Sequence, residues 1–179
     1  MKKINDKHYC YAGNILRVDL TDGKIWTELT EKYAKRWIGG RAINTWILLN
    51  ELNPEIEWDD PQNLLTFGVG VLVGTLAPGA CRVSVDTKNA FNNGIGSANV
   101  GGFFGAELKF AGFDNIIISG KAKNPVYLWI CDKKVEIIDA AYIWAKTTWE
   151  TEREIRKNLN DERIRVAAIG PAGENLVKS

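Results

Sequence analysis

The residues best suited to chemistry lie in a glycine-rich stretch, N-N-G-I-G-S-A-N-V-G-G, at positions 92–102. Glycines lack a Cβ and accept positive φ angles, so backbone N–H groups there can converge on an anion or a flat ligand. We expect a loop from Gly94 to Gly102 and a short apolar helix from Phe103 to Phe113. A helix that begins directly after a loop offers free N–H groups and a positive dipole end. The pattern predicts a site for a phosphate-bearing cofactor.

Arg82 is the second candidate for chemistry. It follows the sequence A-P-G-A-C and begins an expected strand at residues 82–87. The planar guanidinium group of arginine binds phosphate through two parallel hydrogen bonds. We therefore interpret Arg82 as a phosphate ligand beside a glycine-rich turn. A solvent-exposed surface arginine is the alternative.

Glu107 is unusual within the expected helix. At about 100° per residue, the apolar side chains form one broad arc: Phe103, Phe104, Ala106, Leu108, Phe110 and Ala111. Glu107 falls inside this arc, and Lys109 falls opposite it. A carboxylate on a core-facing surface needs a partner, so we expect Glu107 to pair with an arginine or with backbone donors near the site. The alternative is a solvated Glu107 at an exposed helix end.

Neither glycine-rich stretch of the chain fits a nucleotide-binding fingerprint. The pattern G-x-G-x-x-G requires a strand before it and a helix after it. The G-I-G at 94–96 has Asn99 at the third glycine position, and the G-V-G at 68–70 has Val73 there. The sequence also lacks the G-K-[ST] of a P-loop. A dinucleotide-binding fold is therefore disfavoured.

The composition restricts the class of protein and of partner. Of the 179 residues, 45% are hydrophobic and 25% are charged, and the net charge is +1, which is ordinary for one soluble globular domain. This balance indicates neither nucleic acid nor an anionic membrane as a partner, and no apolar run reaches the ~18 residues of a membrane span. The first residues, M-K-K-I-N-D-K-H, lack the apolar core of a signal peptide, so we expect a cytoplasmic protein.

The cysteines and the histidine do not have the spacing of a metal site. Cys10, Cys81 and Cys131 lie far apart, and the single histidine is His8. No C-x-x-C pair or zinc-type pattern links them. We expect ordinary buried or surface thiols.

The elements that must position the candidate residues are predicted from periodicity and turn signals. Apolar alternation and short apolar runs predict strands, Asp-Gly at 22–23 predicts a hairpin, and Thr147 with Glu150 fits a capping box. We expect strands at residues 14–20, 25–29, 64–67, 82–87, 115–119, 126–131, 135–138 and 163–169. We expect helices at residues 31–38 with Thr30 as the cap, 41–52, 103–113 and 148–159. Hairpins dominate, so the predicted class is α+β with largely antiparallel sheets.

The domain organisation is predicted to be a single domain over residues 1–179. A glycine-rich segment, G-P-A-G-E-N at 170–175, lies close to the last residue. We expect such a segment to lead into a further element. The chain is therefore expected to be a fragment, or one part of a larger or split enzyme.

Six separated motifs occur in the order found in a known family. They are Y-A-G-N-I-L-R-V-D-L at 11–20, W-I-G-G-R-A at 37–42, G-T-L-A-P at 74–78, A-N-V-G-G-F-F-G-A-E-L-K-F-A-G-F-D at 98–114, G-K-A-K-N-P-V-Y at 120–127 and I-G-P-A-G-E-N at 169–175. The chain resembles the N-terminal domain of tungsten-containing aldehyde:ferredoxin oxidoreductases. The resemblance implies a two-sheet base under a tungsten (or molybdenum) bis-pyranopterin cofactor.

The resemblance also implies roles for individual residues. Arg82 would contact a cofactor phosphate. Asn99, with Gly101 near it, would lie at the pterin, and the Asn99 backbone would bind a magnesium ion that bridges the two phosphates. Ala98 and Gly102 belong to the same cofactor-binding segment. No catalytic residue is expected in this chain, and a [4Fe–4S] cluster would lie only in further domains.

The resemblance gives Glu107 a role and also has departures. Glu107 matches the glutamate of the family's Glu-Leu-Lys helix, which implies structural support for the site. Cys81 stands where many relatives have a glycine, and Val100 stands where relatives often have a small or hydroxyl residue. These two positions alter the expected fine contacts to the pterin.

Two functions follow as hypotheses. In the first, the complete enzyme oxidises an aldehyde to a carboxylic acid and passes the electrons to ferredoxin. Its partners are the remaining domains or a subunit, with a second copy of the chain as a further candidate, and the isolated 179-residue chain is inactive. In the second, the chain is a non-catalytic scaffold or cofactor-handling module of the same fold.

Overall fold

The computed structural model describes residues 10–132 and 134–178, so His8 lies outside the described residues. The described strands are β1 (Asn14–Asp19), β2 (Lys24–Leu29), β3 (Leu65–Val69), β4 (Val83–Lys88), β5 (Ile95–Val100), β6 (Phe113–Ser119), β7 (Val126–Cys131) and β8 (Lys134–Asp139). The described helices are α1 (Glu31–Trp37), α2 (Arg41–Glu51), α3 (Phe104–Phe110), the 3-10 helix η1 (Ala141–Ile143), α4 (Thr148–Leu159) and α5 (Gly170–Glu174).

Two sheets form the framework of the fold. The larger sheet has the strand order β2-β1-β6-β3-β4-β5, and β7 pairs with β8 in the smaller one. Every described strand pair is antiparallel except β1 with β6. This arrangement confirms the predicted α+β class with two largely antiparallel sheets. It places β5 at one edge of the larger sheet.

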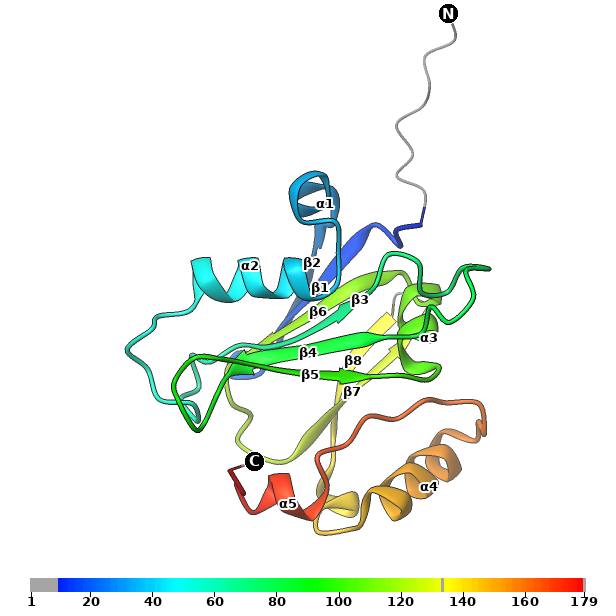
Figure 1. Cartoon of the computed structure of the whole chain (residues 1–179). Coiled ribbons are helices and arrows are strands. Elements are labelled where there is room, and N and C mark those ends of the chain that lie inside the picture. The colour runs from blue at the N-terminus through cyan, green and yellow to red at the C-terminus, as the bar shows by residue number, and fades with distance from the viewer. Residues whose placement is uncertain (1–9, 133, 179) are drawn as a thin grey trace, which may run out of the picture.

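The helices and the small hairpin cover opposite faces of the larger sheet (Figure 1). Helices α1 and α2 lie on one face, where Ile43 and Ile47 of α2 pack on Ile117 of β6. Helix α3 and the β7–β8 hairpin lie on the other face, where Leu108 packs with Ile116. Adjacent residues of β6 thus enter different cores, as the period of two of a strand requires. The strand predicted at residues 115–119 is confirmed, and most of β6 is buried.

Several local predictions are also confirmed. Strands β1 and β2 form a hairpin whose register runs from Asn14 opposite Leu29 to Asp19 opposite Lys24. Helix α4 begins with the expected capping box, in which Thr147 accepts a hydrogen bond from the Glu150 N–H and the Glu150 side chain accepts from the Thr147 N–H. These elements form where short-range signals and tertiary packing agree.

The segment predicted to be a loop at 94–102 is mostly a strand. Residues Ile95–Val100 form β5, which pairs antiparallel with β4 along its length. Glycine, asparagine and serine have low strand propensity, so the residue types of this segment do not indicate a strand. Pairing with the backbone of β4 decides the conformation instead.

Two further predictions are wrong. Residues 163–169 do not form a strand; Ile164 and Val166 pack on the small core of Ala140, Ile143 and Ile155 under α4.

Thr30 does not cap α1 with its side chain. The Thr30 hydroxyl donates instead to Asp114 Oδ2 at 2.7 Å, because a buried carboxylate needs donors more than an exposed helix end does. Asp114 also accepts from the Ala12 and Gly13 N–H groups.

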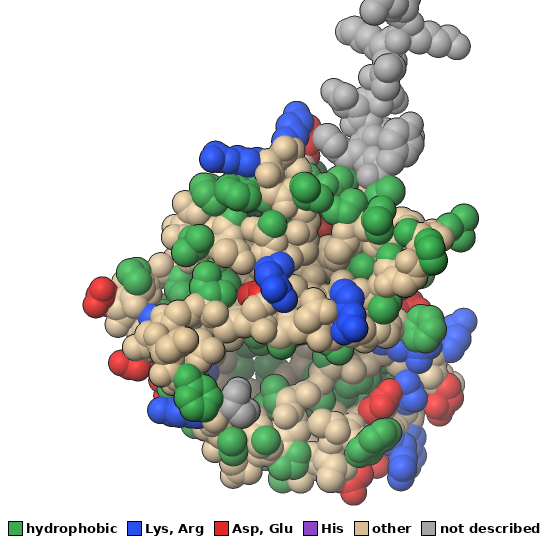
Figure 2. Space-filling model, in the orientation of Figure 1, with side chains coloured by type: hydrophobic (Ala, Val, Ile, Leu, Met, Phe, Trp, Pro, Cys, Tyr) green, Lys and Arg blue, Asp and Glu red, His purple; other side chains and the backbone are tan. Residues whose placement is uncertain are grey.

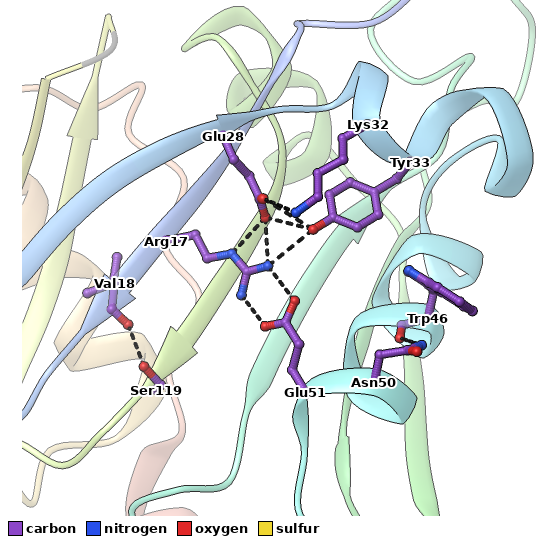
Figure 3. Close-up of polar contacts among 9 residues, drawn as sticks. All are labelled: Arg17, Val18, Glu28, Lys32, Tyr33, Trp46, Asn50, Glu51 and Ser119. Carbon is purple, nitrogen blue, oxygen red and sulfur yellow. Dashed lines mark hydrogen bonds and ion pairs between the residues drawn. The ribbon is translucent and has the colours of Figure 1, made fainter.

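A charge network ties the β1–β2 hairpin to both helices of its face (Figure 3). Arg17, whose side chain is 11% exposed, forms ion pairs at 2.6 Å with Glu28 of β2 and with Glu51 of α2. The hydroxyl of Tyr33 donates to Glu28 at 3.1 Å. Burial raises the pKa of Glu28, but the hydrogen bonds and charges of Arg17 and Lys32 lower it more, so the net pKa lies below its ordinary value.

This network gives the protein a defined acid sensitivity. Because the folded-state pKa of Glu28 is depressed, its stabilising effect is fully present above about pH 4.5 and is lost as the pH falls through the folded-state value. We expect Glu28→Gln to make the free energy of unfolding depend less steeply on pH in that acid range. Urea unfolding between about pH 3 and 7 measures this. The matched control is Glu136→Gln, which removes an exposed pair with Lys134; equal pH slopes for wild type and Glu28→Gln would contradict the account.

Candidate functional site

Strands β4 and β5 carry polar side chains on the sheet face that α2 covers. Along β4, Ser84 and Asp86 point to this face, while Val83 enters the opposite core. Ser84 lies opposite Asn99 and Asp86 lies opposite Ser97 in the antiparallel register. Cross-strand partners point to the same side of a sheet, so Asn99 shares this polar face. Ala98 lies opposite Val85, so its side chain points to the other face and only its backbone is available here.

Arg82 lies directly beside Gly101, the first of the two glycines that follow β5. A Cβ added at Gly101 would be 3.7 Å from Arg82 Cζ and 3.6 Å from Cys81 Sγ. Gly102 has a φ of +103°, and a Cβ added there would meet no atom within 4 Å. The register therefore brings the predicted residues Arg82, Asn99, Gly101 and Gly102 to one end of the β4–β5 edge.

The guanidinium group of Arg82 is free to bind a ligand. Arg82 is exposed, and within residues 10–132 and 134–178 its side chain has no hydrogen bond or ion pair with the protein, although its backbone carbonyl accepts from the Gly70 N–H. Figure 2 shows this side of the molecule with a large tan area, the colour of backbone and of side chains that are neither hydrophobic nor charged, and with separate basic side chains on it. An arginine side chain that has no protein partner and lies over backbone without Cβ atoms can bind an anion at close range from the solvent side.

A buried polar cluster that the sequence did not reveal lies beneath this edge. Asp86 is fully buried, and its Oδ2 accepts from Asn44 Nδ2 at 2.7 Å. Its Oδ1 accepts from the hydroxyls of Ser84, at 3.0 Å, and of Ser97. The alternation R-V-S-V-D-T was the available signal, since it places polar residues on one face of a strand otherwise rich in valine.

The prediction that Glu107 is buried and paired is wrong for this chain. Glu107 is exposed, and Phe103 and Phe110 of the predicted core arc are 67% and 65% exposed. Helix α3 packs through Gly105 and Leu108 instead. A Cβ added at Gly105 would be 2.6 Å from Val83 Cγ2, so the smallest residue, and not the aromatic arc, faces the sheet. Helix α3 can lie this close to the sheet only with Gly105 facing the sheet.

Lys109 takes the buried position. Its side chain is 8% exposed, and its ammonium group donates to the carbonyl oxygens of Val71, at 2.7 Å, and of Cys10. Asp114 Oδ1 lies 3.9 Å away. Burial lowers the pKa of Lys109, and the charge of Asp114 offsets this in part. Lys109 thus fastens α3 to the 70–79 loop and to the segment before β1.

Replacing the two charged residues of α3 is expected to change the stability by unequal amounts. Lys109→Ala removes a largely buried ammonium group and its hydrogen bonds to two carbonyl oxygens, so it should lower the free energy of unfolding by about 1–3 kcal/mol. Glu107→Ala serves as the matched control and should change it by less than about 0.5 kcal/mol, because the side chain is exposed. Denaturant unfolding measures both. A larger loss for Glu107→Ala than for Lys109→Ala would restore the buried-glutamate interpretation.

Other sites are scarce among the described residues. Cys10 and Cys131 are exposed and Cys81 is half-buried, all as free thiols. In the described ranges, no group of three His, Cys, Asp or Glu side chains could hold a metal ion. None of the described helices is long and apolar enough to cross a membrane.

Comparisons with known proteins place the chain in a family. Residues 15–179 match the family described as "Aldehyde ferredoxin oxidoreductase, N-terminal domain". The chain is 49% identical to the tungsten-containing aldehyde ferredoxin oxidoreductase of Pyrococcus abyssi, over 94% of this chain and 28% of that protein. It is 38% identical to the aliphatic sulfonate oxidoreductase, WOR-like subunit, of Pyrococcus furiosus, over 95% of this chain and 30% of that protein.

A solved structure shows the same fold. In the active site complex BamBC of benzoyl coenzyme A reductase with 1,5-dienoyl-CoA, one chain matches with a TM-score of 0.91 and 43% identity. The match covers 93% of this chain and 26% of that chain. The chain spans about 28% of the length of the first curated relatives that it matches. By sequence and by fold, the chain therefore belongs to the aldehyde ferredoxin oxidoreductase family, as its N-terminal domain.

Proposed function

We propose that this chain is the cofactor-binding base of a pterin oxidoreductase that contains tungsten or, alternatively, molybdenum. The complete enzyme would oxidise an aldehyde to a carboxylic acid and pass the electrons to ferredoxin. One observation carries the proposal: the unpaired guanidinium of Arg82 lies over Gly101, beside Asn99, at an open sheet edge. The tungsten-containing relatives support the choice of metal.

The residues of this edge fit a bis-pyranopterin with phosphate groups. Arg82 would hold a phosphate through its fork of N–H donors. Gly101 and Gly102 add no side chain, so the pterin could approach the backbone closely. The edge strand β5 leaves some backbone groups without a strand partner, and the Asn99 backbone would bind a magnesium ion between the phosphates. Ala98 would take part through its backbone.

The division of labour follows from this fit. The metal–dithiolene unit, when bound, supplies the redox chemistry. The chain's own residues bind the cofactor's anionic end and fix its orientation against a rigid sheet. We assign no catalytic residue to this chain, and we place the [4Fe–4S] cluster in the remaining domains. We also propose a cytoplasmic location, where ferredoxin would be the electron acceptor.

The remaining domains are the proposed partners of an exposed apolar surface next to the site. Phe103, Phe110, Leu72 and Leu76 are all exposed, and the ring of Phe110 would be 3.3 Å from a Cβ added at Gly74. Exposed apolar surface of this kind marks an interaction site. In the assembled enzyme, Glu107 would lie in this interface and support the cofactor edge from there. A second copy of the enzyme is a further proposed partner.

The test is to purify the natural protein anaerobically from its source and to measure its mass, tungsten, molybdenum, iron and pterin in one sample. We expect a much longer polypeptide, or a tightly bound partner chain, with tungsten, iron and pterin in constant ratio. A free chain of 179 residues without metal or pterin would contradict the proposal. It would favour the non-catalytic scaffold or cofactor-handling module.

A further inference from the structure

Arg41 is a second arginine on the polar face of the β4–β5 edge. It is the first residue of α2, and its Nε donates to Ser84 Oγ at 3.2 Å. Its side chain is 56% exposed, and Asp86 Oδ1 lies 4.0 Å from Nε. Within the described part of the chain, its two terminal nitrogens have no hydrogen-bond or ion-pair partner. Arg41 is thus anchored at one nitrogen and free at the other two.

The anchor of Arg41 is rigid because Asp86 joins three elements. Asp86 accepts hydrogen bonds from α2 through Asn44, from β4 through Ser84 and from β5 through Ser97. Asn44 in turn accepts from Asn115 of β6 at 2.8 Å. A fully buried carboxylate is tolerated only with such partners. The cluster therefore fixes the position of Ser84 and, through it, of the Arg41 guanidinium.

Arg41 and Arg82 flank the segment that the proposed cofactor would occupy. Ser84, which holds Arg41, lies directly opposite Asn99, and Arg82 lies against Gly101. Two residues along a strand span about 7 Å, so the two arginine anchors are neighbours on one face. Arg82 and the two free nitrogens of Arg41 carry like charges on this face, which an anion bound between them would neutralise. Helix α2 has eleven residues and no acidic residue in its first turn, so its positive dipole end adds to the same field.

We propose that Arg41 is a second anion-binding residue of the cofactor site, and that Asp86 is its positioning residue. The ligand chemistry is a phosphate or pyrophosphate group held between Arg41 and Arg82. The inference rests on the proposed function, since it concerns the same edge. It assigns to the W-I-G-G-R-A motif the role of delivering a guanidinium from α2 to the sheet.

The test uses the holoenzyme that contains this domain. Arg41→Ala, Arg41→Lys, Arg82→Ala and the control Arg153→Ala are each purified, washed with rising salt and assayed for pterin and tungsten per polypeptide. Arg153 is an exposed arginine of α4. We expect Arg41→Ala to lower retained pterin about tenfold, in line with the loss of one charge-assisted contact. Arg41→Lys keeps the charge but not the fork and should fall between. Arg153→Ala should match wild type.

The outcomes separate this inference from the proposed function. Loss of pterin in both Arg41→Ala and Arg82→Ala supports both. Loss in Arg82→Ala with wild-type retention in Arg41→Ala overturns the inference and leaves the proposed function intact. Wild-type retention in both variants overturns the phosphate site itself. A lower melting temperature of the cofactor-free Arg41→Ala protein would show a structural role for Arg41 and would also count against the inference.

Asp86 is tested through a double-mutant cycle with pterin retention as the readout. We expect Asp86→Asn to lower retention when Arg41 is present and to have no further effect in the Arg41→Ala background. If Asp86→Asn fails to fold, Ser97→Ala replaces it in the cycle, since it removes one donor to the same carboxylate. Equal losses in both backgrounds would overturn the positioning role.

Discussion

Replacing Arg82 with alanine is expected to lower the pterin affinity of the proposed holoenzyme by about tenfold to a hundredfold. The Arg82 side chain has no described partner within the chain, so its removal costs the fold little. A hydrogen bond to a charged group contributes about 1.5–3 kcal/mol, and about 1.4 kcal/mol corresponds to a factor of ten. The measurement is pterin and tungsten per polypeptide after gel filtration.

A companion variant removes space instead of charge at the same place. Gly101→Ala keeps the backbone in an ordinary region, and its Cβ would be 3.7 Å from Arg82 Cζ, which is normal van der Waals contact. We expect the protein to fold as wild type but to retain less pterin, because the methyl group occupies the close-approach surface. Wild-type pterin content in both variants would contradict the placement of the cofactor at this edge.

Gly68→Ala is expected to have the largest effect on stability. Gly68 is buried in β3, and a Cβ added there would lie 2.6 Å from the Gly40 carbonyl oxygen and 2.7 Å from Asn44 Nδ2. Backbone at the start of α2 would have to move, which disturbs Asn44 and the Asp86 cluster. We expect a loss of about 3 kcal/mol in the free energy of unfolding.

The control for that variant is Gly70→Ala. Its Cβ would be 3.4 Å from Val73 Cγ2 and would meet no closer atom, so a loss below about 1 kcal/mol is expected. Denaturant unfolding of both variants gives the comparison. Similar stabilities for Gly68→Ala and Gly70→Ala would show that α2 does not sit as tightly on β3 as its geometry requires.

Part of the site could be predicted because its signals are local. Arg82 next to a glycine-rich turn and Gly101 with Gly102 after Asn99 are recognisable from residue type alone. The structure brings these residues together through the β4–β5 register. The sequence could predict each strand of the β1–β2 hairpin for the same reason, since the alternation and the Asp-Gly turn lie within a few residues of one another.

The remainder depends on contacts between distant residues. Strand β5 exists because β4 pairs with it, although its own residues favour a turn. The rotation of α3 is set by Gly105 against Val83, which exposes Glu107 and buries Lys109. The Thr30 hydroxyl donates a hydrogen bond to Asp114, which lies 84 positions later in the chain. A hydrophobic arc drawn on a helical wheel contains none of this information.

The position of the cofactor in a crystal of the holoenzyme tests the central claim most directly. Anomalous scattering at the tungsten edge would locate the metal, and the density around it would locate the phosphate groups. The account predicts a phosphate within hydrogen-bond distance of the Arg82 guanidinium, with a magnesium ion at the Asn99 backbone. A cofactor whose phosphates contact neither Arg82 nor the segment from Ala98 to Gly102 would contradict it.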